Sequence, residues 1–147
     1  MTVDVRKPRY AIGLGCDRGT PLATVQACVD AALAQIGATV ADVVAAASID
    51  AKADEAAFLE LAARHGWAMQ WFSAAQLAAV PVPNPSATVQ RYMGTPSVSE
   101  AAALLAGGVA MADLRVEKHK LRGADGKNAT VSIALAPFPF PSSPFLS

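Results

Sequence analysis

The 147-residue sequence predicts an α/β domain of three layers, α/β/α, with a mixed central sheet between two layers of helices. Two observations predict this class. Short apolar runs typical of buried strands alternate with longer segments of helical apolar spacing, and such alternation is typical of a sheet covered on both faces. A hairpin-type turn separates the last two expected strands, and a hairpin makes the sheet mixed.

Three apolar runs in the first half of the chain are predicted to be buried strands, at 10–14, 44–49 and 67–72. Each run is only a few residues long and ends near a glycine or a group of polar residues, as is typical of strands covered on both faces. One turn of helix is expected at 39–43, immediately before the second strand.

The first long helix is expected to begin after a glycine-rich turn and to end at Gly37. Thr20 supplies a hydroxyl at the N-cap, and Pro21 occupies the first helical position, where proline loses no hydrogen bond. Apolar residues then follow the helical period. Cys28 falls on the apolar face, so it is expected to be a core residue.

The second long helix is expected at 54–65, with Gly66 at its C-cap. Asp54 is interpreted as the N-cap of this helix and Glu55 as a solvated charge. The apolar positions expected to face the core are Phe58, Leu59 and Ala62.

Capping boxes and turns organise the second half of the chain. Ser73 with Gln76 forms one capping box, and Ser97 with Glu100 forms another. The prolines of "VPVPNPS" force an extended loop between them, and "GADGKN" is typical of a hairpin turn. The expected elements are short helices at 73–79 and 86–92, a longer helix ending at 106, and strands at 114–118 and 130–136.

One folded domain is expected at 9–136, which is a common domain length. Residues 1–8 are interpreted as a flexible arm. The proline- and phenylalanine-rich residues 137–147 are expected to be disordered.

Charge and cysteine content narrow the classes of function. Twelve basic residues balance twelve acidic ones, which argues against a nucleic-acid binder. No apolar run is long enough to cross a membrane, no signal peptide is recognised, and two cysteines cannot make a disulfide framework. These features predict a cytoplasmic protein with neither nucleic acid nor membrane as a partner.

The stretch "IGLGCDRGTP" at 12–21 is the first candidate binding segment. A strand that passes through a glycine turn into a helix N-terminus presents N–H groups and a partial positive charge, which together accept phosphate or carboxylate. Arg18 adds a permanent forked charge. The pattern is neither a P-loop nor GxGxxG, and a tight turn without a ligand is the alternative.

Three further segments place polar residues where an expected element ends: "ASIDAKADE" at 47–55, "VPNPS" at 82–86 and "GTPSVSE" at 94–100. In open α/β sheets, ligands bind beyond the carboxyl ends of the strands. Ordinary caps, solvated charges and a rigid linker are the alternatives. Over all four segments, the candidate ligand-binding residues are Gly15, Cys16, Arg18, Gly19, Thr20, Asp50, Lys52, Asn84, Ser86, Gly94, Thr95 and Ser97.

Catalytic candidates are few. Cys16 is a candidate nucleophile because a helix N-terminus favours a thiolate, and Asp50 or His119 is a candidate general base. Neither His65 nor His119 is near Cys16 in sequence, so no catalytic pair is recognised. No metal-ligand spacing occurs, and no metal site is expected.

Taken in this order, "GLGCDRGT", "ASIDAKADE", "VPNPS" and "GTPSVSEAAAL" resemble the blocks that mark the CobE / CbiG C-terminal domain family of cobalamin (vitamin B12) biosynthesis. The later "KHK…NATVSIA" is similar to the closing hairpin of that family. The resemblance covers roughly residues 9–136.

The resemblance implies a three-layer α/β/α domain that acts in corrin-ring construction. Fused relatives carry further N-terminal domains and open the ring-A lactone of a cobalt-precorrin in the anaerobic route. This chain lacks those domains, so it resembles the stand-alone type associated with the aerobic route. The implied partners are a precorrin or other corrinoid polycarboxylate and other enzymes of the pathway, and no cofactor is implied.

Two functions stay open within this family. One is binding or carrying a precorrin or hydrogenobyrinic acid intermediate, an apolar macrocycle fringed with carboxylates that needs donors around an apolar floor. The other is an enzyme, a hydrolase or lyase acting on the ring-A lactone or the extruded carbon. A phosphate- or nucleotide-binding domain is a third possibility, and the missing P-loop lysine argues against it.

Overall fold

The computed structural model describes residues 8–82 and 98–136. Within these residues, five strands form one sheet in the order β3-β2-β1-β5-β4. The pairs β1–β2 and β2–β3 are parallel, whereas β5 runs antiparallel to both β1 and β4, so the sheet is mixed as expected. The strands are β1 (Arg9–Cys16), β2 (Val43–Ile49), β3 (Met69–Phe72), β4 (Leu114–Arg122) and β5 (Asn128–Ala136).

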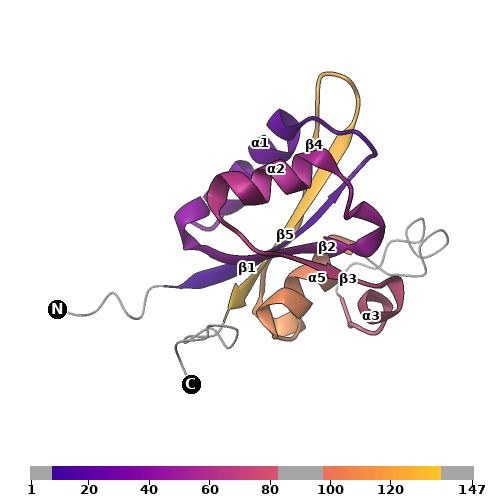
Figure 1. The fold of residues 1–147 in the computed structure, drawn as a ribbon. Coiled ribbons are helices and arrows are strands. Elements are labelled where there is room, and N and C mark those ends of the chain that lie inside the picture. Colours follow the sequence, from indigo (N-terminus) through magenta and orange to yellow (C-terminus); the bar gives the residue numbers. More distant parts are fainter. Residues whose placement is uncertain (1–7, 83–97, 137–147) are drawn as a thin grey trace.

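Helices cover both faces of this sheet, and the predicted three-layer α/β/α fold is confirmed (Figure 1). The helices α1 and α2 lie on one face, and α3 and α5 lie on the other. The described helices are α1 (Leu22–Ala34), α2 (Ala56–His65), α3 (Ala74–Ala78) and α5 (Val98–Gly107). Over the described ranges, no helix combines the length and the apolar character that crossing a membrane requires.

The two faces of the sheet are packed with side chains of different size. Because side chains alternate along a strand, Ile12 and Leu14 of β1 point to α1 and α2, where Phe58 and Leu33 complete a core of large side chains. The opposite face is lined mostly by alanine. Its buried members include Ala11, Ala45, Ala47, Ala101, Ala102 and Ala106. Small side chains on both partners allow α5 to lie close to the sheet.

Gly13 marks the closest approach of α5 to β1. A Cβ atom on Gly13 would collide with the carbonyl oxygen of Ser99 and would lie 2.6 Å from the backbone nitrogen of Ala103. Only a residue without a side chain fits under the helix here. Gly13 therefore fixes where the first turns of α5 sit on the sheet.

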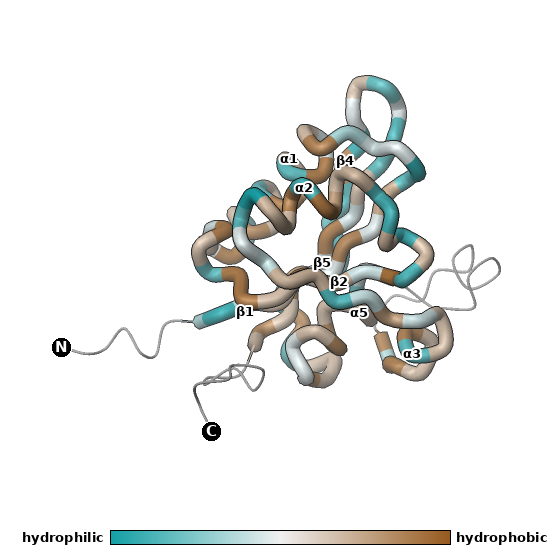
Figure 2. Tube along the Cα trace, viewed as in Figure 1, coloured by the Kyte–Doolittle hydropathy of each residue, from teal (hydrophilic) through white to brown (hydrophobic). Residues whose placement is uncertain are grey.

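Hydropathy follows these layers (Figure 2). The β4–β5 turn at the far end of the hairpin is hydrophilic, whereas the strands at the centre carry hydrophobic residues. Strand β4 continues to Arg122, four residues beyond the expected end at Lys118, because it pairs with β5 along this stretch. The sequence did not predict this part of the strand, since its outer positions are charged and its apolar alternation is weak. The turn itself is closed by hydrogen bonds from Gly123 N–H to Lys127 O and from Gly126 N–H to Gly123 O.

The start of α1 differs from the prediction. Its N-cap is Pro21, not Thr20, and no side chain caps this end of the helix. The carbonyl of Pro21 accepts hydrogen bonds from the N–H groups of Thr24 and Val25. Thr20 is buried in the preceding turn, where its hydroxyl donates to the carbonyl of Asp17 at 2.7 Å. The hydroxyl thus stabilises the turn and not the helix.

The second helix corrects two further predictions. Asp54 is not its N-cap, because α2 is preceded by Glu55, which makes no side-chain capping bond. Leu59 does not face the core, since 47% of it is exposed. Phe58 and Ala62 are buried as expected, and Leu61 takes the buried position that was expected for Leu59. The helix begins at Ala56, two residues later than expected.

Several local predictions are confirmed. Ser73 and Gln76 form the expected capping box, in which each backbone N–H donates to the other side chain. Gly37 and Gly66 follow α1 and α2 in the left-handed conformation, with φ of 68° and 74°. The short turn expected at 39–43 is a 3-10 helix at Val40–Asp42. The helix predicted at 86–92 and the cap at Ser97 lie outside the described residues, as do the tail and nearly all of the arm.

Replacing Gly13 by alanine should lower the free energy of unfolding by about 3 kcal/mol, because α5 must move off β1 to admit the methyl group. Gly37→Ala is the control. Its Cβ meets nothing within 4 Å, so only the left-handed backbone opposes it, at about 1 kcal/mol. Urea unfolding followed by circular dichroism measures both. Equal losses would mean that α5 does not depend on Gly13.

Candidate functional site

The candidate site is built on two neighbouring loops. Strands β1 and β2 are adjacent and parallel, so the β1–α1 turn at 17–21 and the β2–α2 turn at 50–55 leave the sheet at the same edge. Hydrogen bonds and ion pairs between the loops confirm that they meet. The site segments at 12–21 and 47–55 are therefore brought together as predicted.

The β1–α1 turn is held by the first residue of β5. Asp17 N–H donates to the carbonyl of Asn128 at 3.0 Å, and Asn128 N–H donates back to Asp17 Oδ2 at 2.8 Å. The bond from the Asn128 backbone lowers the pKa of the Asp17 carboxyl. Gly19 then reverses the chain with φ of 78°, a conformation that glycine adopts without strain. This positions the N–H of Gly19 toward the second loop.

Glu55 is the centre of the arrangement. Its side chain is only 4% exposed, although the sequence suggested a solvated charge. Gly19 N–H donates to Glu55 Oε2 at 2.8 Å. The other oxygen, Oε1, lies 3.2 Å from Arg18 Nη1 and 3.7 Å from Lys52 Nζ. The glycine turn binds a carboxylate that belongs to the protein itself. Binding of a ligand carboxylate at this turn stays a prediction.

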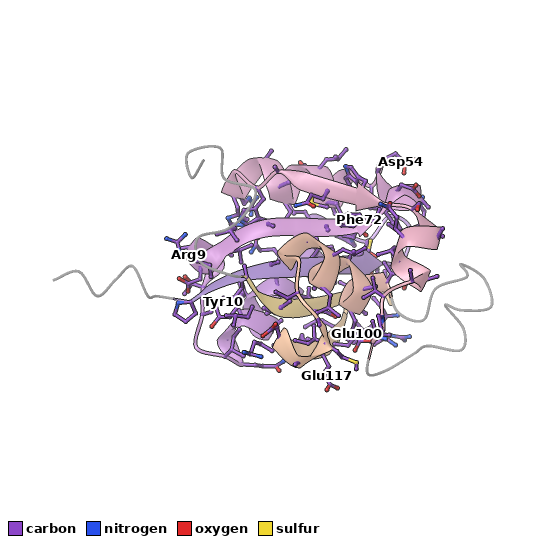
Figure 3. All side chains as sticks on the ribbon, turned by 90° about the horizontal axis from the view of Figure 1, so that it is seen from below. Arg9, Tyr10, Asp54, Phe72, Glu100 and Glu117 are labelled. Carbon is purple, nitrogen blue, oxygen red and sulfur yellow. The ribbon has the colours of Figure 1, made fainter. Side chains whose placement is uncertain are left out.

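Arg18 connects this buried carboxylate to the surface. Its Nη1 donates to Asp54 Oδ1 at 2.8 Å, and its Nη2 donates to the carbonyl of Ala51 at 3.2 Å. The pair is exposed, with 60% of the Arg18 side chain and 79% of the Asp54 side chain accessible. The hydrogen bond to Asp54 raises the pKa of Arg18, and Arg18 lowers the pKa of Asp54. Asp54 in Figure 3 marks this edge of the molecule.

Cys16 lies at the end of β1, beside this cluster. Its thiol is half-buried, and burial raises its pKa, with the nearby Lys52 acting in the opposite direction. The expectation that the helix N-terminus favours a thiolate here is wrong, because desolvation outweighs the favourable charges. Cys28 is buried as predicted, and burial raises its pKa to about 12.

The two histidines do not join Cys16. His119 lies on β4, and the sheet order puts β5 between β4 and the strand of Cys16, which separates them by roughly 10 Å. The Nδ1 of His119 is 2.8 Å from Gln35 Nε2 at the end of α1. His65 contacts Gln26 and stacks on Trp67 with ring centroids 4.7 Å apart. Both rings are thus engaged in packing and hydrogen bonding within the fold.

The predicted site residues divide into four groups. Arg18, Gly19 and Lys52 converge on Glu55, whereas Gly15, Cys16 and Thr20 line β1 and its turn without touching that carboxylate in the described contacts. Asp50 is exposed at the start of the second loop. The residues outside the described part of the chain are Asn84, Ser86, Gly94, Thr95 and Ser97.

Sequence reasoning missed Glu55 and Asn128. Nothing local distinguishes Glu55 from Asp54, since both follow the same strand and precede the same helix. The available signal was the glycine turn itself, which calls for an anion, combined with the adjacency of the first two parallel strands. Within the residues that the structure describes, no three His, Cys, Asp or Glu side chains group closely enough to hold a metal ion.

A separate groove of about 440 Å³ lies at the other end of α5. Its lining is apolar and includes none of the predicted site residues. It is formed by Ala79, Val80, Pro81, Leu104, Leu105, Val109, Ala110 and Met111. The polar cluster around Glu55 and this apolar groove are therefore distinct features.

Residues 10–134 match the family model described as "Cobalamin synthesis G C-terminus". The chain belongs to this family. It is a cobalamin-biosynthesis protein, and the family resemblance read from its four segments is confirmed. The matched residues include the whole sheet except Arg9 of β1 and Leu135 and Ala136 of β5.

Three relatives illustrate this membership. The chain is 35% identical over 128 residues to the cobalt-precorrin-5A hydrolase of Priestia megaterium, and 39% identical over 99 residues to the Protein CobE of a Sinorhizobium species. These matches cover 87% and 66% of this chain. The crystal structure of CobE, a protein from the cobalamin biosynthetic pathway, superposes with a TM-score of 0.74 at 31% identity, covering 89% of this chain and 92% of that one.

The two curated relatives are longer than the part matched here. The chain spans 32% of the hydrolase and 64% of the CobE sequence. Family membership therefore applies to the domain that is shared, and it does not assign the activity of the whole hydrolase to this chain.

Glu55→Gln should lower the free energy of unfolding by about 2 kcal/mol at pH 7, the scale of a lost hydrogen bond to a buried charged group. The amide keeps the shape of the side chain and an acceptor for Gly19 N–H, but it loses the attraction to Arg18 and Lys52. Asp54→Asn is the matched control and should change stability little, because its ion pair is exposed. Urea unfolding of both variants is the measurement, and equal effects would contradict the central role of Glu55.

The raised pKa of Cys28 predicts a loss of stability in alkali. The folded protein keeps this thiol protonated up to about pH 12, while the unfolded chain releases the proton near its ordinary value of roughly 8.5. Stability is full below that value and falls as the pH rises above it. In urea unfolding, the free energy of unfolding of Cys28→Ala should fall less steeply between pH 8 and pH 10 than that of the wild type. Parallel curves for the two proteins would refute the assignment.

Proposed function

We propose that the protein binds a corrinoid precursor by its carboxylates at the carboxyl ends of β1 and β2, and carries it without transforming it. The observation that carries this proposal is the convergence of Arg18, Gly19 N–H and Lys52, from two loops, on one carboxylate. Corrin precursors are apolar macrocycles whose rim is a set of carboxylates. An edge that already binds a carboxylate with these three donors has the chemistry that such a rim needs.

The exposed half of the cluster is the part that a ligand can reach. Glu55 is buried and holds the loops, whereas the Arg18–Asp54 pair is open to solvent. A ligand carboxylate can therefore replace Asp54 on Arg18 and leave Glu55 in place. Asp54 therefore competes with the ligand carboxylate for Arg18.

A carrier role is favoured over an enzyme by the state of the candidate catalytic groups. Burial raises the pKa of the Cys16 thiol, which disfavours the thiolate, and His119 lies two strands away from it. Nucleophilic catalysis requires a nucleophile and a base within hydrogen-bond reach of each other. The described residues around the Glu55 cluster offer no such pair.

The similarity to CobE supports a place in the aerobic route, with a precorrin or hydrogenobyrinic acid intermediate as ligand. The second candidate is an enzyme, a hydrolase or lyase on the ring-A lactone or the extruded carbon. The 35% identity to a cobalt-precorrin-5A hydrolase favours it. This chain spans about a third of that hydrolase, so the shared domain alone does not carry the activity over.

Anaerobic titration with hydrogenobyrinic acid and earlier precorrins, followed by absorbance and mass, tests the proposal. Saturable binding with unchanged ligand mass is the expected result. Arg18→Gln should weaken binding by about tenfold, the scale of one charge-assisted hydrogen bond. Asp54→Asn should tighten it by a smaller factor, because the competitor for Arg18 is lost.

Glu60→Gln, an exposed acid on α2, is the matched control for charge alone. If it tightens binding as much as Asp54→Asn does, net charge explains the effect and the exchange on Arg18 is wrong. A change in ligand mass with turnover would replace the carrier by the enzyme. No binding of any precursor by the wild-type chain would remove the proposed function.

A further inference from the structure

The apolar groove at the C-terminal end of α5 is open to solvent. Met111, one of its lining residues, is 43% exposed, and its neighbour Ala110 is exposed as well, whereas Leu104 is buried. Single exposed apolar side chains are ordinary on protein surfaces. A groove of about 440 Å³ whose lining residues are all apolar is different, because it has the size and character of a binding pocket.

Strand β5 ends beside this groove. A Cβ atom on Gly107 would lie 3.4 Å from the carbonyl oxygen of Leu135, so the last turn of α5 lies against the end of β5 (Figure 1). Val109, two residues after Gly107, lines the groove. Ala134 of β5 belongs to the same buried cluster as Leu104, and Val109 packs against that cluster. The chain therefore leaves the sheet within a few residues of the groove.

The sequence that follows β5 is apolar and rich in proline. Residues 137–147, "PFPFPSSPFLS", carry three phenylalanines and no charged side chain. Phe138 is three residues beyond Leu135, which is a span of up to about 11 Å in an extended chain. Phe138 and Phe140 each stand between two prolines. Because proline restricts its own backbone and that of the preceding residue, binding such a segment costs less conformational entropy than binding an ordinary one.

We propose that the groove at the end of α5 binds residues 137–147 of this chain, with Phe138 and Phe140 as the apolar side chains that enter it. Attachment through β5 holds this segment near the groove at an effective concentration on the order of 1 mM, which favours it over a second copy or a separate partner. Removal of the phenylalanine rings from water supplies the driving force. Contact with the groove then orders a segment for which the sequence alone predicts disorder.

This inference goes beyond the proposed function and does not rest on it. The groove shares no residue with the Glu55 cluster, which lies at the carboxyl ends of β1 and β2. A ligand at that cluster and the segment in the groove can therefore be tested separately.

Oxidation of Met111 by hydrogen peroxide, followed by mass spectrometry of its peptide, measures whether the groove is covered. In the full chain, Phe138→Ser combined with Phe140→Ser should speed this oxidation by about threefold or more, because the thioether loses its cover. Met69 on β3 is the internal reference, and its rate should stay the same. Leu59→Ser is the matched control, since it removes an exposed apolar side chain from α2 on the opposite face. It should change neither rate.

Equal oxidation rates of Met111 in the wild type and the double variant would overturn the proposal. Slow oxidation of wild-type Met111 that is lost on dilution of the protein would assign the groove to a second copy. Slow oxidation that appears only after hydrogenobyrinic acid is added would assign the groove to the ligand. Either result would also overturn the proposal, whereas a failure of the wild-type chain to bind any precursor would remove the proposed function alone.

Discussion

The buried carboxylate of Glu55 is the interaction on which the functional edge of this domain depends. A buried charge without partners is strongly unfavourable, so Glu55 requires Gly19 N–H, Arg18 and Lys52 to stay where they are. Those partners come from two loops that are far apart in sequence. The carboxylate thus makes one rigid unit of the turns after β1 and β2, and any ligand at this edge meets donors that are already positioned.

The other determinant of the site is the close contact between α5 and β1. Gly13 and the alanines around it let the helix lie low on the sheet, and the helix starts just short of Gly15. The loop cluster at Glu55 and the N-terminus of α5 lie toward the same end of the parallel strands, on the edge where α/β sheets commonly bind ligands.

Most of the fold could be predicted from the sequence because strand and helix periods are local properties. The alternation of short apolar runs with helical stretches predicts the three layers, and "GADGKN" predicts the antiparallel hairpin. The failures have a shared cause. Glu55, Thr20 and Leu59 were assigned from their neighbours in the chain, whereas their true environment is set by residues elsewhere or by the exact phase of a helix. The meeting of Gly19 with Glu55 spans 36 positions, and a single sequence carries no local sign of it.

The alanine-lined layer under α5 has a consequence for how this domain can vary. Alanine has no side-chain rotamers, so burying it costs no side-chain conformational entropy. It also cannot change rotamer to make room for a larger neighbour. On the α1 side, a smaller side chain at one position can be compensated by a larger one at a neighbouring position, because cores tolerate substitutions that keep the total volume. On the α5 side, nearly every substitution of a buried alanine enlarges the side chain. We therefore expect that layer to diverge slowly among related chains, with change concentrated in the opposite core.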